Sequence, residues 1–440
     1  MIGHRSEGQT PAAADGGRSL VVGLYCVGWP PSAFANGIVT YVDAIAEGMR
    51  ALGHRPVILA GTVSEPAERR EGIPVIDLKP LETPDVPARL ADALASRLRG
   101  RSGWVSPRWI GRALRKVARR TDGRPRLDVL EVEESFGLPG MVAGRVRVPV
   151  VARLHGPWFL TGPYQGVDPS APEFEARVRA EGRGLRRSAA ITAPSRDVLA
   201  RSAAHYGLPA GSGEVIPNPV RPVPPEARWR AEGCEPEHIL FVGRFDRCKG
   251  GDTVIDAFAL LLRDRPGARL TIIGPDGNPA RNGIGETLPE YAAARLPGAL
   301  EDGRIRWLGR RPPSEIAALR ARAAVTVVAS RYETFSLTAA EAMAAGCPLV
   351  ATRVGGAAEL FEHGTHGLHV EPDDPAALAS AVSSVLADPA GAEAMGRSAL
   401  EHSLKRFAPE AVAARTIDVY RRVLGLGGGS RLAAREGMRP

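Results

Sequence analysis

The sequence has 440 residues, of which 44% are hydrophobic, and a formal net charge of +8 at pH 7. This length predicts two or three domains, and the hydrophobic content is typical of a globular protein. The sequence has no run of about 20 apolar residues and no apolar core of a secretory signal, so we expect a cytoplasmic protein without a transmembrane helix. Four scattered cysteines lack metal-ligand spacing and predict free thiols in a reducing compartment.

The N-terminal half alternates apolar runs with amphipathic segments. Residues 1–18 are small and polar, and we expect them to be disordered. A strand over 20–27, a Gly/Pro loop, a helix over 38–52 and a strand over 56–60 predict a parallel βαβ unit, which binds ligands at the carboxyl ends of its strands. The N-terminal domain is predicted to span 19–217. Its further strands are predicted at 127–132, 148–154 and 189–193.

A strongly basic segment covers residues 97–120. Trp104, Trp109 and several aliphatic residues alternate with Arg and Lys in this segment. Basic and aromatic residues together are typical of a surface that contacts an anionic membrane. A solvated helix face that packs its apolar side on the sheet fits the same pattern. No nucleic-acid-binding motif is evident, and we expect no nucleic-acid partner.

One histidine lies at a position where a ligand is expected to bind. His155 directly follows the strand predicted over 148–154 and precedes Gly156 and Pro157. The carboxyl end of a parallel strand lies at the edge of the sheet where ligands bind, and not in the core. We therefore interpret His155 as a candidate site residue, although most lone histidines are structural.

The alternation restarts after a proline-rich stretch over 218–237, which we interpret as a linker. A strand at 238–242 and a helix at 252–263 begin a second α/β domain, predicted over 238–408. Its further strands are predicted at 269–273, 305–308 and 323–329. Closing helices are predicted at 375–387, 390–406 and 409–425. A flexible tail is expected over 426–440.

The loop after the strand at 238–242 is rich in glycine and contains two cations. Gly243 and Arg244 begin this loop, and Lys249 lies near its end. Arginine binds phosphate through two hydrogen bonds, lysine supplies a compact charge, and glycine lets the backbone approach a ligand. This loop is therefore a candidate phosphate site.

Residues 330–346 combine a turn, a helix and two glutamates. The apolar run at 323–329 predicts a buried strand, and the residues after the turn predict a helix that ends at Gly346. Free N–H groups at the start of such a helix favour an anion. The carboxylates of Glu333, in the turn, and Glu341, in the helix, accept hydrogen bonds from hydroxyl groups. A diphosphate between two hydroxyl-bearing groups, as in a nucleotide sugar, fits this arrangement.

The motif E-T-F-S at Glu333, followed by E-A-M-A-A-G-C-P-L-V-A-T at Glu341, resembles the signature of the retaining glycosyltransferases of family 4. The resemblance covers residues from about 20 to 424 and is strongest over 238–372. It implies the GT-B fold, an α/β architecture in which two Rossmann-like, doubly wound domains face each other across an interdomain cleft. It also implies that the helix at 409–425 packs back on the N-terminal domain.

The resemblance implies roles for the candidate residues. Arg244 and Lys249 would hold the diphosphate of the donor, Glu333 would bind sugar hydroxyls, and Glu341 would bind the ribose. The implied catalytic residues are His155, Arg244, Lys249 and Glu333. Residues implied to contact or border the donor are also Asn36, Gly37, Gly243, Gly274, Arg310, Thr334, Phe335, Ser336, Leu337 and Glu341.

The implied activity is transfer of a sugar from a nucleoside-diphosphate sugar to a hydroxyl of an acceptor, in polysaccharide, glycolipid or other glycoconjugate synthesis. Fixed cations and a helix start offset the charge of the leaving diphosphate, so we expect no metal ion and no cofactor. No residue stands out as a covalent nucleophile, and we expect front-face transfer with retention. The acceptor would be a saccharide or a lipid-linked molecule. In the second case, residues 97–120 would bring the protein to the inner face of the membrane.

Other functions share part of this pattern. A nucleotide-sugar epimerase of the same fold and a non-catalytic nucleotide-sugar-binding subunit are the alternatives. A phosphorylase needs a pyridoxal lysine, and the sequence is poor in lysine. A nicotinamide dehydrogenase needs G-x-G-x-x-G after the first strand, which V-G-W-P-P-S does not supply. The sequence identifies neither the donor base, the sugar, the acceptor nor the oligomeric state.

Overall fold

The computed structural model describes residues 18–34, 36–64, 72–81, 107–119, 126–209, 211–280 and 282–426. Three predicted segments therefore lie wholly or partly outside the described residues. They are the N-terminal residues 1–17, the part of the basic segment that contains Trp104 (97–106, and residue 120), and the tail from 427 to 440.

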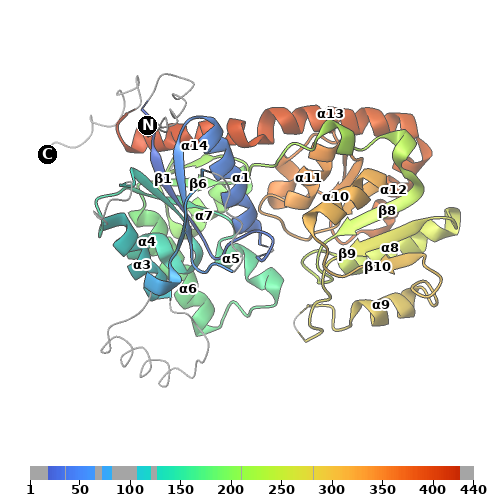
Figure 1. Cartoon of the computed structure of the whole chain (residues 1–440). Helices are drawn as coiled ribbons and strands as arrows, with labels where there is room; N and C mark the ends of the chain where they lie inside the picture. Colours follow the sequence, from blue (N-terminus) through green and yellow to red (C-terminus); the bar gives the residue numbers. More distant parts are fainter. Residues whose placement is uncertain are drawn as a thin grey trace, which may run out of the picture.

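A seven-stranded parallel sheet forms the centre of the first domain (Figure 1). Its strand order is β3-β2-β1-β4-β5-β6-β7. All six residues of β1 are buried, as expected for a strand that is covered on both faces. The strands are β1 (Val21–Cys26), β2 (Arg55–Ala60), β3 (Val75–Asp77), β4 (Val129–Glu133), β5 (Val150–Arg153), β6 (Ala190–Ala193) and β7 (Gly213–Val215).

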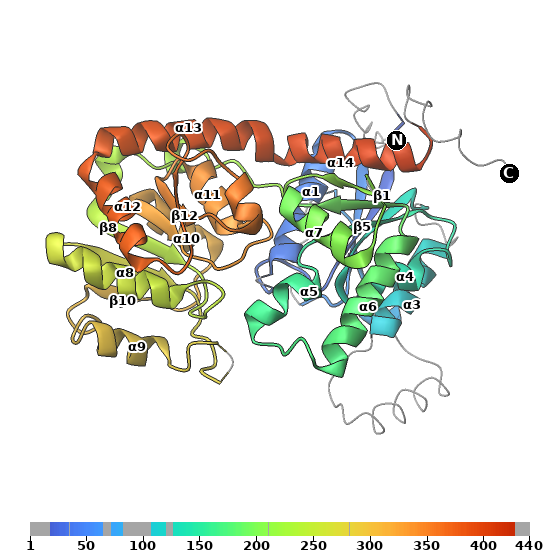
Figure 2. The ribbon, with the colours of Figure 1, turned by 180° about the vertical axis from the view of Figure 1, so that it is seen from behind.

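Helices cover both faces of this sheet (Figures 1 and 2). Val22 and Leu24 of β1 pack with α1 (Gly37–Ala51), whereas Val21 and Tyr25 pack on the opposite side with α3 (Pro107–Arg119). This alternation is the two-residue period of a strand. Among the described residues, the other α-helices of this domain are α4 (Leu138–Val142), α5 (Trp158–Thr161), α6 (Pro172–Arg187) and α7 (Arg196–Tyr206).

A six-stranded parallel sheet forms the second domain, in the order β10-β9-β8-β11-β12-β13. Its strands are β8 (Glu235–Val242), β9 (Arg269–Ile273), β10 (Ile305–Trp307), β11 (Ala323–Val328), β12 (Leu349–Thr352) and β13 (Leu368–Val370). Its helices are α8 (Gly251–Asp264), α9 (Leu288–Arg295), α10 (Pro313–Arg322), α11 (Leu337–Ala345), the 3₁₀ turn η6 (Gly355–Glu359), α12 (Pro375–Ala387) and α13 (Pro389–Phe407).

The last helix returns to the first domain. Figure 1 shows α13 along the second domain and α14 (Pro409–Val423) continuing over the first. Ile417 and Tyr420 of α14 are buried in the same core cluster as Ile45 of α1. The two helices approach so closely that a Cβ at Gly48 would lie 2.2 Å from the carbonyl oxygen of Pro409. Glycine is therefore required at this crossing.

The predicted fold class, two Rossmann-like α/β domains, is confirmed by the two sheets. The proline-rich stretch interpreted as a linker differs in detail, because β8 already begins at Glu235. In this stretch the Trp229 side chain is buried, and its Nε1 donates a hydrogen bond to Ala323 O at 2.7 Å. The stretch therefore packs on the second domain. In the described ranges, every helix is too short or too polar to span a bilayer.

Candidate active site

Three loops meet at the carboxyl edge of the second sheet. Gly243 N, after β8, donates to Ile273 O at 2.9 Å, and Gly274 N, after β9, donates to Gly309 O at 2.9 Å. The φ of Gly274 is 148°, and a Cβ there would lie only 2.0 Å from Gly243 O. Gly243 and Gly274, which were both predicted to bind or border the nucleotide-sugar donor, thus allow neighbouring loops to touch. Arg310, the next predicted residue, is exposed at the end of the β10 loop.

Asp246 organises the cationic loop. Its Oδ2 accepts a hydrogen bond from Arg244 Nε at 2.6 Å, and its Oδ1 accepts one from Lys249 N at 2.8 Å. The Asp246 side chain is buried, whereas half of the Arg244 side chain is exposed. One carboxylate therefore fixes the arginine and the backbone at the lysine. Sequence reasoning missed Asp246, although an Asp three residues before an N–H that it caps is a recognisable local pattern.

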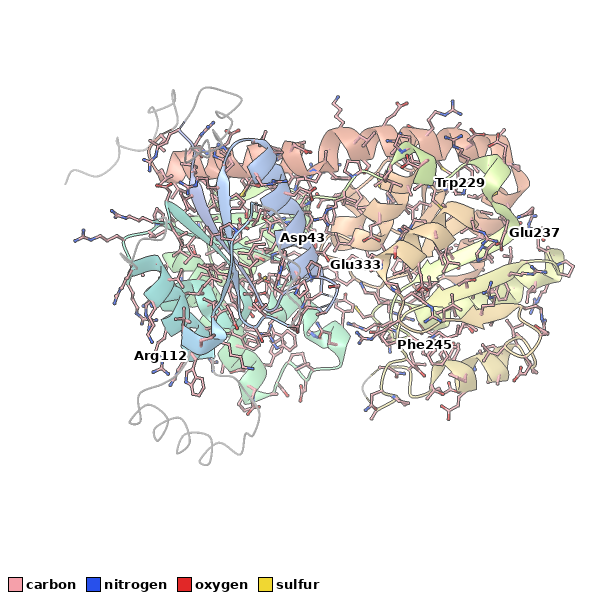
Figure 3. All side chains as sticks on the ribbon, viewed as in Figure 1. Asp43, Arg112, Trp229, Glu237, Phe245 and Glu333 are labelled. Atoms are coloured by element: carbon pink, nitrogen blue, oxygen red, sulfur yellow. The ribbon has the colours of Figure 1, made fainter. Side chains whose placement is uncertain are left out.

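An ion pair joins this loop to the Glu333 turn. Lys249 Nζ lies 2.6 Å from Glu333 Oε1, and Ser330 Oγ donates to the same oxygen at 2.7 Å. Burial by itself lowers the pKa of the Lys249 ammonium, but the charge and hydrogen bond of Glu333 outweigh burial and raise it. The lysine is therefore a fixed positive charge at neutral pH. Figure 3 shows Glu333 on the side of the second domain that faces α1.

The start of α11 lies beside this ion pair. Ser336, its N-cap residue, has φ 72°, and its buried Oγ has no hydrogen-bond partner. The first N–H groups of an α-helix have no partner within the helix, so this end favours an anion. Thr334 is half-buried in the turn, but Phe335 is buried against Phe407, with ring centroids 5.6 Å apart. The Phe335 side chain therefore points into the core, and only its backbone faces the turn.

The second predicted glutamate lies further along α11. Glu341 Oε2 accepts a hydrogen bond from Arg320 Nη2 at 2.9 Å, and 41% of the Glu341 side chain remains exposed. Because Arg320 is itself buried, the carboxylate is held at one side and open at the other. A hydroxyl group can therefore still reach it.

The starts of α1 and α11 meet across the two domains. A Cβ at Gly37 would lie 3.5 Å from Leu337 Cδ1, which is ordinary van der Waals contact. Asn36 caps α1, because its side-chain oxygen accepts a hydrogen bond from Ile38 N at 2.8 Å. The predicted Asn36-Gly37 motif is thus brought to the same place as the turn that contains Glu333.

His155 is held by a buried carboxylate. Glu134 accepts hydrogen bonds from His155 N at 3.0 Å and from Gly156 N at 2.7 Å. The imidazole packs edge-on against the Tyr41 ring of α1, with centroids 4.9 Å apart. Burial, and then the charge of Arg153, lower the pKa of His155 well below its ordinary value. The imidazole is therefore neutral at physiological pH and can accept or donate a hydrogen bond.

Buried acids surround this histidine loop, and sequence reasoning missed them. Burial raises the pKa of Glu133 to about 8, and the neighbouring charge of Glu134 adds to this shift. Burial and the charge of Glu181 raise the pKa of Glu134 to about 7. Glu181 accepts a hydrogen bond from Trp158 N at 2.8 Å, so it holds the same loop. Nothing in the sequence distinguishes these acids from solvated ones.

Comparison with known proteins matches both halves of the chain to family models. Residues 35–223 match a family described as Glycosyltransferase Family 4, and residues 236–388 match one described as Glycosyl transferases group 1. The chain is 36% identical over 198 residues to a glycogen synthase of Mycobacterium tuberculosis, covering 44% of this chain and 45% of that protein. It is 31% identical over 294 residues to a D-inositol 3-phosphate glycosyltransferase of Corynebacterium efficiens, covering 62% and 66%. The matches to the first relatives thus span less than half of their length.

Solved structures share the whole fold. A sucrose-phosphate synthase from Thermosynechococcus elongatus superposes with a TM-score of 0.68 at 24% identity, covering 93% of this chain and 100% of that one. An Anabaena protein in complex with UDP superposes with a TM-score of 0.64 at 18% identity, covering 92% and 100%. At these identities the likeness shows the GT-B fold.

The buried acids predict a pH-dependent stability, and Glu133→Gln should remove the part of it that Glu133 contributes. Because burial raises the pKa of Glu133 from 4.5 to about 8, the protonated carboxyl favours the folded state. This contribution is fully present below about pH 4.5 and is lost as the pH rises through about 8. The stability of the wild type should therefore fall relative to that of Glu133→Gln between about pH 5 and about pH 8, by up to about 1.4 kcal/mol per pH unit, and its Tm should fall with it.

Thermal unfolding at several pH values measures this difference. Glu401→Gln, at an exposed glutamate on α13, is the matched control and should follow the wild type at every pH. A Glu133→Gln profile parallel to that of the wild type would contradict the burial of a protonated carboxyl.

Proposed function

The chain belongs to family 4 of the glycosyltransferases, and we propose that it transfers a sugar from a nucleoside-diphosphate sugar to a hydroxyl group of an acceptor. Both family models, and relatives named glycogen synthase and D-inositol 3-phosphate glycosyltransferase, support this activity. Solved neighbours of the same fold were determined in complex with UDP and with UDP-glucose, which supports a nucleotide sugar as donor.

The observation that carries the proposal is the meeting of cations, a helix start and two carboxylates. Arg244 and Lys249 lie in one loop, and Lys249 contacts Glu333 of the turn before α11 at 2.6 Å. The cations and the first N–H groups of α11 suit a diphosphate. The carboxylates of Glu333 and Glu341 suit the hydroxyl groups of the sugar and the ribose on either side of it.

The proposed reaction breaks the bond between the sugar and the diphosphate and forms a bond to the acceptor oxygen on the same face. Arg244, Lys249 and the start of α11 stabilise the negative charge that develops on the leaving diphosphate. The leaving phosphate takes the proton of the acceptor hydroxyl. His155, neutral and held by Glu134, contacts the sugar from the first domain.

The acceptor would be read by the first domain, through the loops that contain Asn36, Gly37 and His155. We propose a saccharide or lipid-linked acceptor, in the synthesis of a polysaccharide or another glycoconjugate. The cysteines Cys26, Cys234, Cys248 and Cys347 are all unpaired, which supports a reducing compartment such as the cytoplasm.

A donor screen with a matched pair of variants tests the diphosphate site. The wild type should slowly release UDP, GDP or ADP from one nucleotide sugar. Arg244→Ala should lower this turnover by about 100-fold, because it removes one fixed charge at the leaving group. Arg304→Ala should leave turnover unchanged, although Arg304 Nε also pairs with an Asp two positions away, at 2.7 Å. Equal rates for folded Arg244→Ala and Arg304→Ala would remove the diphosphate assignment.

We further propose that no divalent metal takes part, because fixed cations and a helix start supply the charge that a metal would otherwise supply. Sugar transfer by the wild type, once its donor is known, should therefore be unchanged in excess EDTA. A metal-dependent glycosyltransferase assayed in the same buffer is the control for chelation. Loss of activity in EDTA and its recovery with one divalent ion would show that the fixed charges are insufficient.

The described part of the basic segment, α3, supports contact with an anionic membrane surface. Ala113, Leu114 and Val117 of this helix are buried in the core, so its apolar face is already occupied. Its other face carries basic side chains, of which Arg115 also donates a hydrogen bond to Met141 O at 2.6 Å: Arg108, Arg112, Arg115, Lys116 and Arg119. We propose electrostatic docking through these charges, at about 1 kcal/mol for each engaged residue, without insertion of the helix into the bilayer.

Vesicle co-sedimentation tests this docking. The wild type should sediment with anionic vesicles at low salt and be released as the ionic strength rises. Replacing Arg108, Arg112, Arg115 and Lys116 by Ser should abolish sedimentation and leave donor hydrolysis intact. A control variant changes the charge by the same amount in the second domain, through Ser at the exposed residues Arg263, Arg311, Arg353 and Arg397. This control should still sediment with the anionic vesicles. A wild type that ignores anionic vesicles at low salt would exclude the membrane contact.

A further inference from the structure

The turn that contains Glu333 is held to the first domain by two groups of contacts between the domains, which we call ties. The first tie is made by its neighbour Tyr332. Tyr332 Oη donates a hydrogen bond to Asp197 Oδ2, on α7, at 2.9 Å. Its ring stacks on Tyr164 of the first domain, with centroids 5.2 Å apart and planes at 10°. The guanidinium of Arg201, also on α7, lies 5.3 Å from the same ring. Because Tyr332 is buried, this contact is shielded from water.

A second tie runs through η6. Glu359, at its end, accepts hydrogen bonds from Arg196 N at 3.0 Å and from Asp197 N at 2.8 Å. These N–H groups belong to the first turn of α7, where the positive end of a helix favours a carboxylate. The helix of one domain is thus capped by an acid of the other. The Glu359 side chain is only 16% exposed, so water competes weakly with this cap.

The start of η6 is attached to the Glu333 turn itself. Gly356 N donates to Glu333 O at 2.7 Å. A Cβ at Gly356 would lie 2.0 Å from Thr334 O and 2.8 Å from Ser195 Oγ of the first domain. The first tie therefore begins at the residue next to Glu333, and the second begins at the end of a turn whose start contacts Glu333. Both end on the first turn of α7. A segment that is fixed at two points cannot rotate about either one alone.

We propose that Asp197, Tyr332 and Glu359 are positioning residues, which hold the Glu333 turn in register with the first domain. This inference rests on the proposed function, in which Glu333 binds the transferred sugar and the first domain binds the acceptor. The ties set the distance and the angle between the two reactants. Reacting atoms that are misplaced by about 1 Å cost about 100-fold in rate, so a loosened turn slows transfer even when the donor still binds.

Tyr332→Phe tests the first tie against a closely matched control. It removes one hydroxyl and keeps the ring. Tyr291→Phe removes the same group from the same kind of contact, because Tyr291 Oη donates to Asp256 Oδ2 at 2.9 Å within the second domain. Amide hydrogen exchange over residues 330–337 should be faster in Tyr332→Phe than in the wild type and unchanged in Tyr291→Phe.

Glu359→Gln tests the second tie, and it also serves if Tyr332→Phe does not fold. An amide presents one accepting oxygen to two N–H groups, so exchange should become faster over both 330–337 and the first turn of α7. Asp374→Asn is its control, because Asp374 caps α12 within the second domain and accepts from Ala377 N at 2.8 Å. Equal exchange in variants and controls would overturn the proposal.

Kinetics separate this proposal from the proposed function. Tyr332→Phe and Glu359→Gln should lower kcat for transfer by about tenfold, the value of one hydrogen bond to a charged group. Their affinity for the nucleoside diphosphate should change by less than about twofold, since Arg244 and Lys249 are untouched. A wild type without any transfer would reject the proposed function, while hydrogen exchange would still decide whether the ties exist. Unchanged kcat with faster exchange would show that the ties are structural and do not position the reactants.

Discussion

The ion pair between Lys249 and Glu333 is the contact on which the candidate site depends. The two residues are far apart in sequence, but they follow β8 and β11, which are neighbours in the parallel sheet. Parallel strands end at the same edge, so the topology itself brings the cation and the carboxylate to 2.6 Å. The pair, which is neutral as a whole, holds the Lys249 ammonium in a fixed position near the start of α11. In the proposed reaction, the leaving group that becomes negative would meet charge that needs no reorganisation.

Close backbone contacts hold this edge together. A Cβ would lie 2.0 Å from Ala329 O at Gly250, from Gly243 O at Gly274 and from Thr334 O at Gly356. Each of these glycines joins loops that follow different strands. From sequence, the glycines of the cationic loop were interpreted as letting the backbone approach a ligand. In the structure, Gly250 and Gly274 first let the protein's own loops approach each other, and this packing fixes the place where a ligand can bind.

Local patterns made much of the fold and part of the site predictable. Buried strands show as apolar runs, and the positions of Lys249 and Glu333 follow from a strand–loop–helix order that the sequence displays. Residues whose role depends on a distant partner could not be found in this way. Glu134 and Glu359 look like solvated acids until the fold places N–H groups beside them. Phe335 shows the converse, because a residue within the motif is buried in the core.

The C-terminal helix α14 supports the candidate site as well as the fold. Tyr420 of α14 and Tyr41 of α1 both donate hydrogen bonds to the buried carboxylate of Glu131, at 2.7 and 2.8 Å. The Tyr41 ring in turn contacts the imidazole of His155 and lies under the guanidinium of Arg153 at 4.7 Å. Arg153 reaches the segment between the domains, because its Nη2 donates to Asn218 Oδ1 at 2.6 Å.

This chain of contacts explains why the polypeptide returns to its first domain after completing the second. A buried carboxylate is costly unless its oxygens accept hydrogen bonds. Glu131 obtains one of its hydrogen-bond donors only from α14. The buried contacts that support the Tyr41 ring against His155 are therefore complete only when the last helix is in place. The position of His155 is therefore coupled, through Tyr41 and Glu131, to the helix that joins the two domains. The first-domain side of the candidate site and the packing of the last helix are consequently linked by one continuous set of contacts among buried side chains.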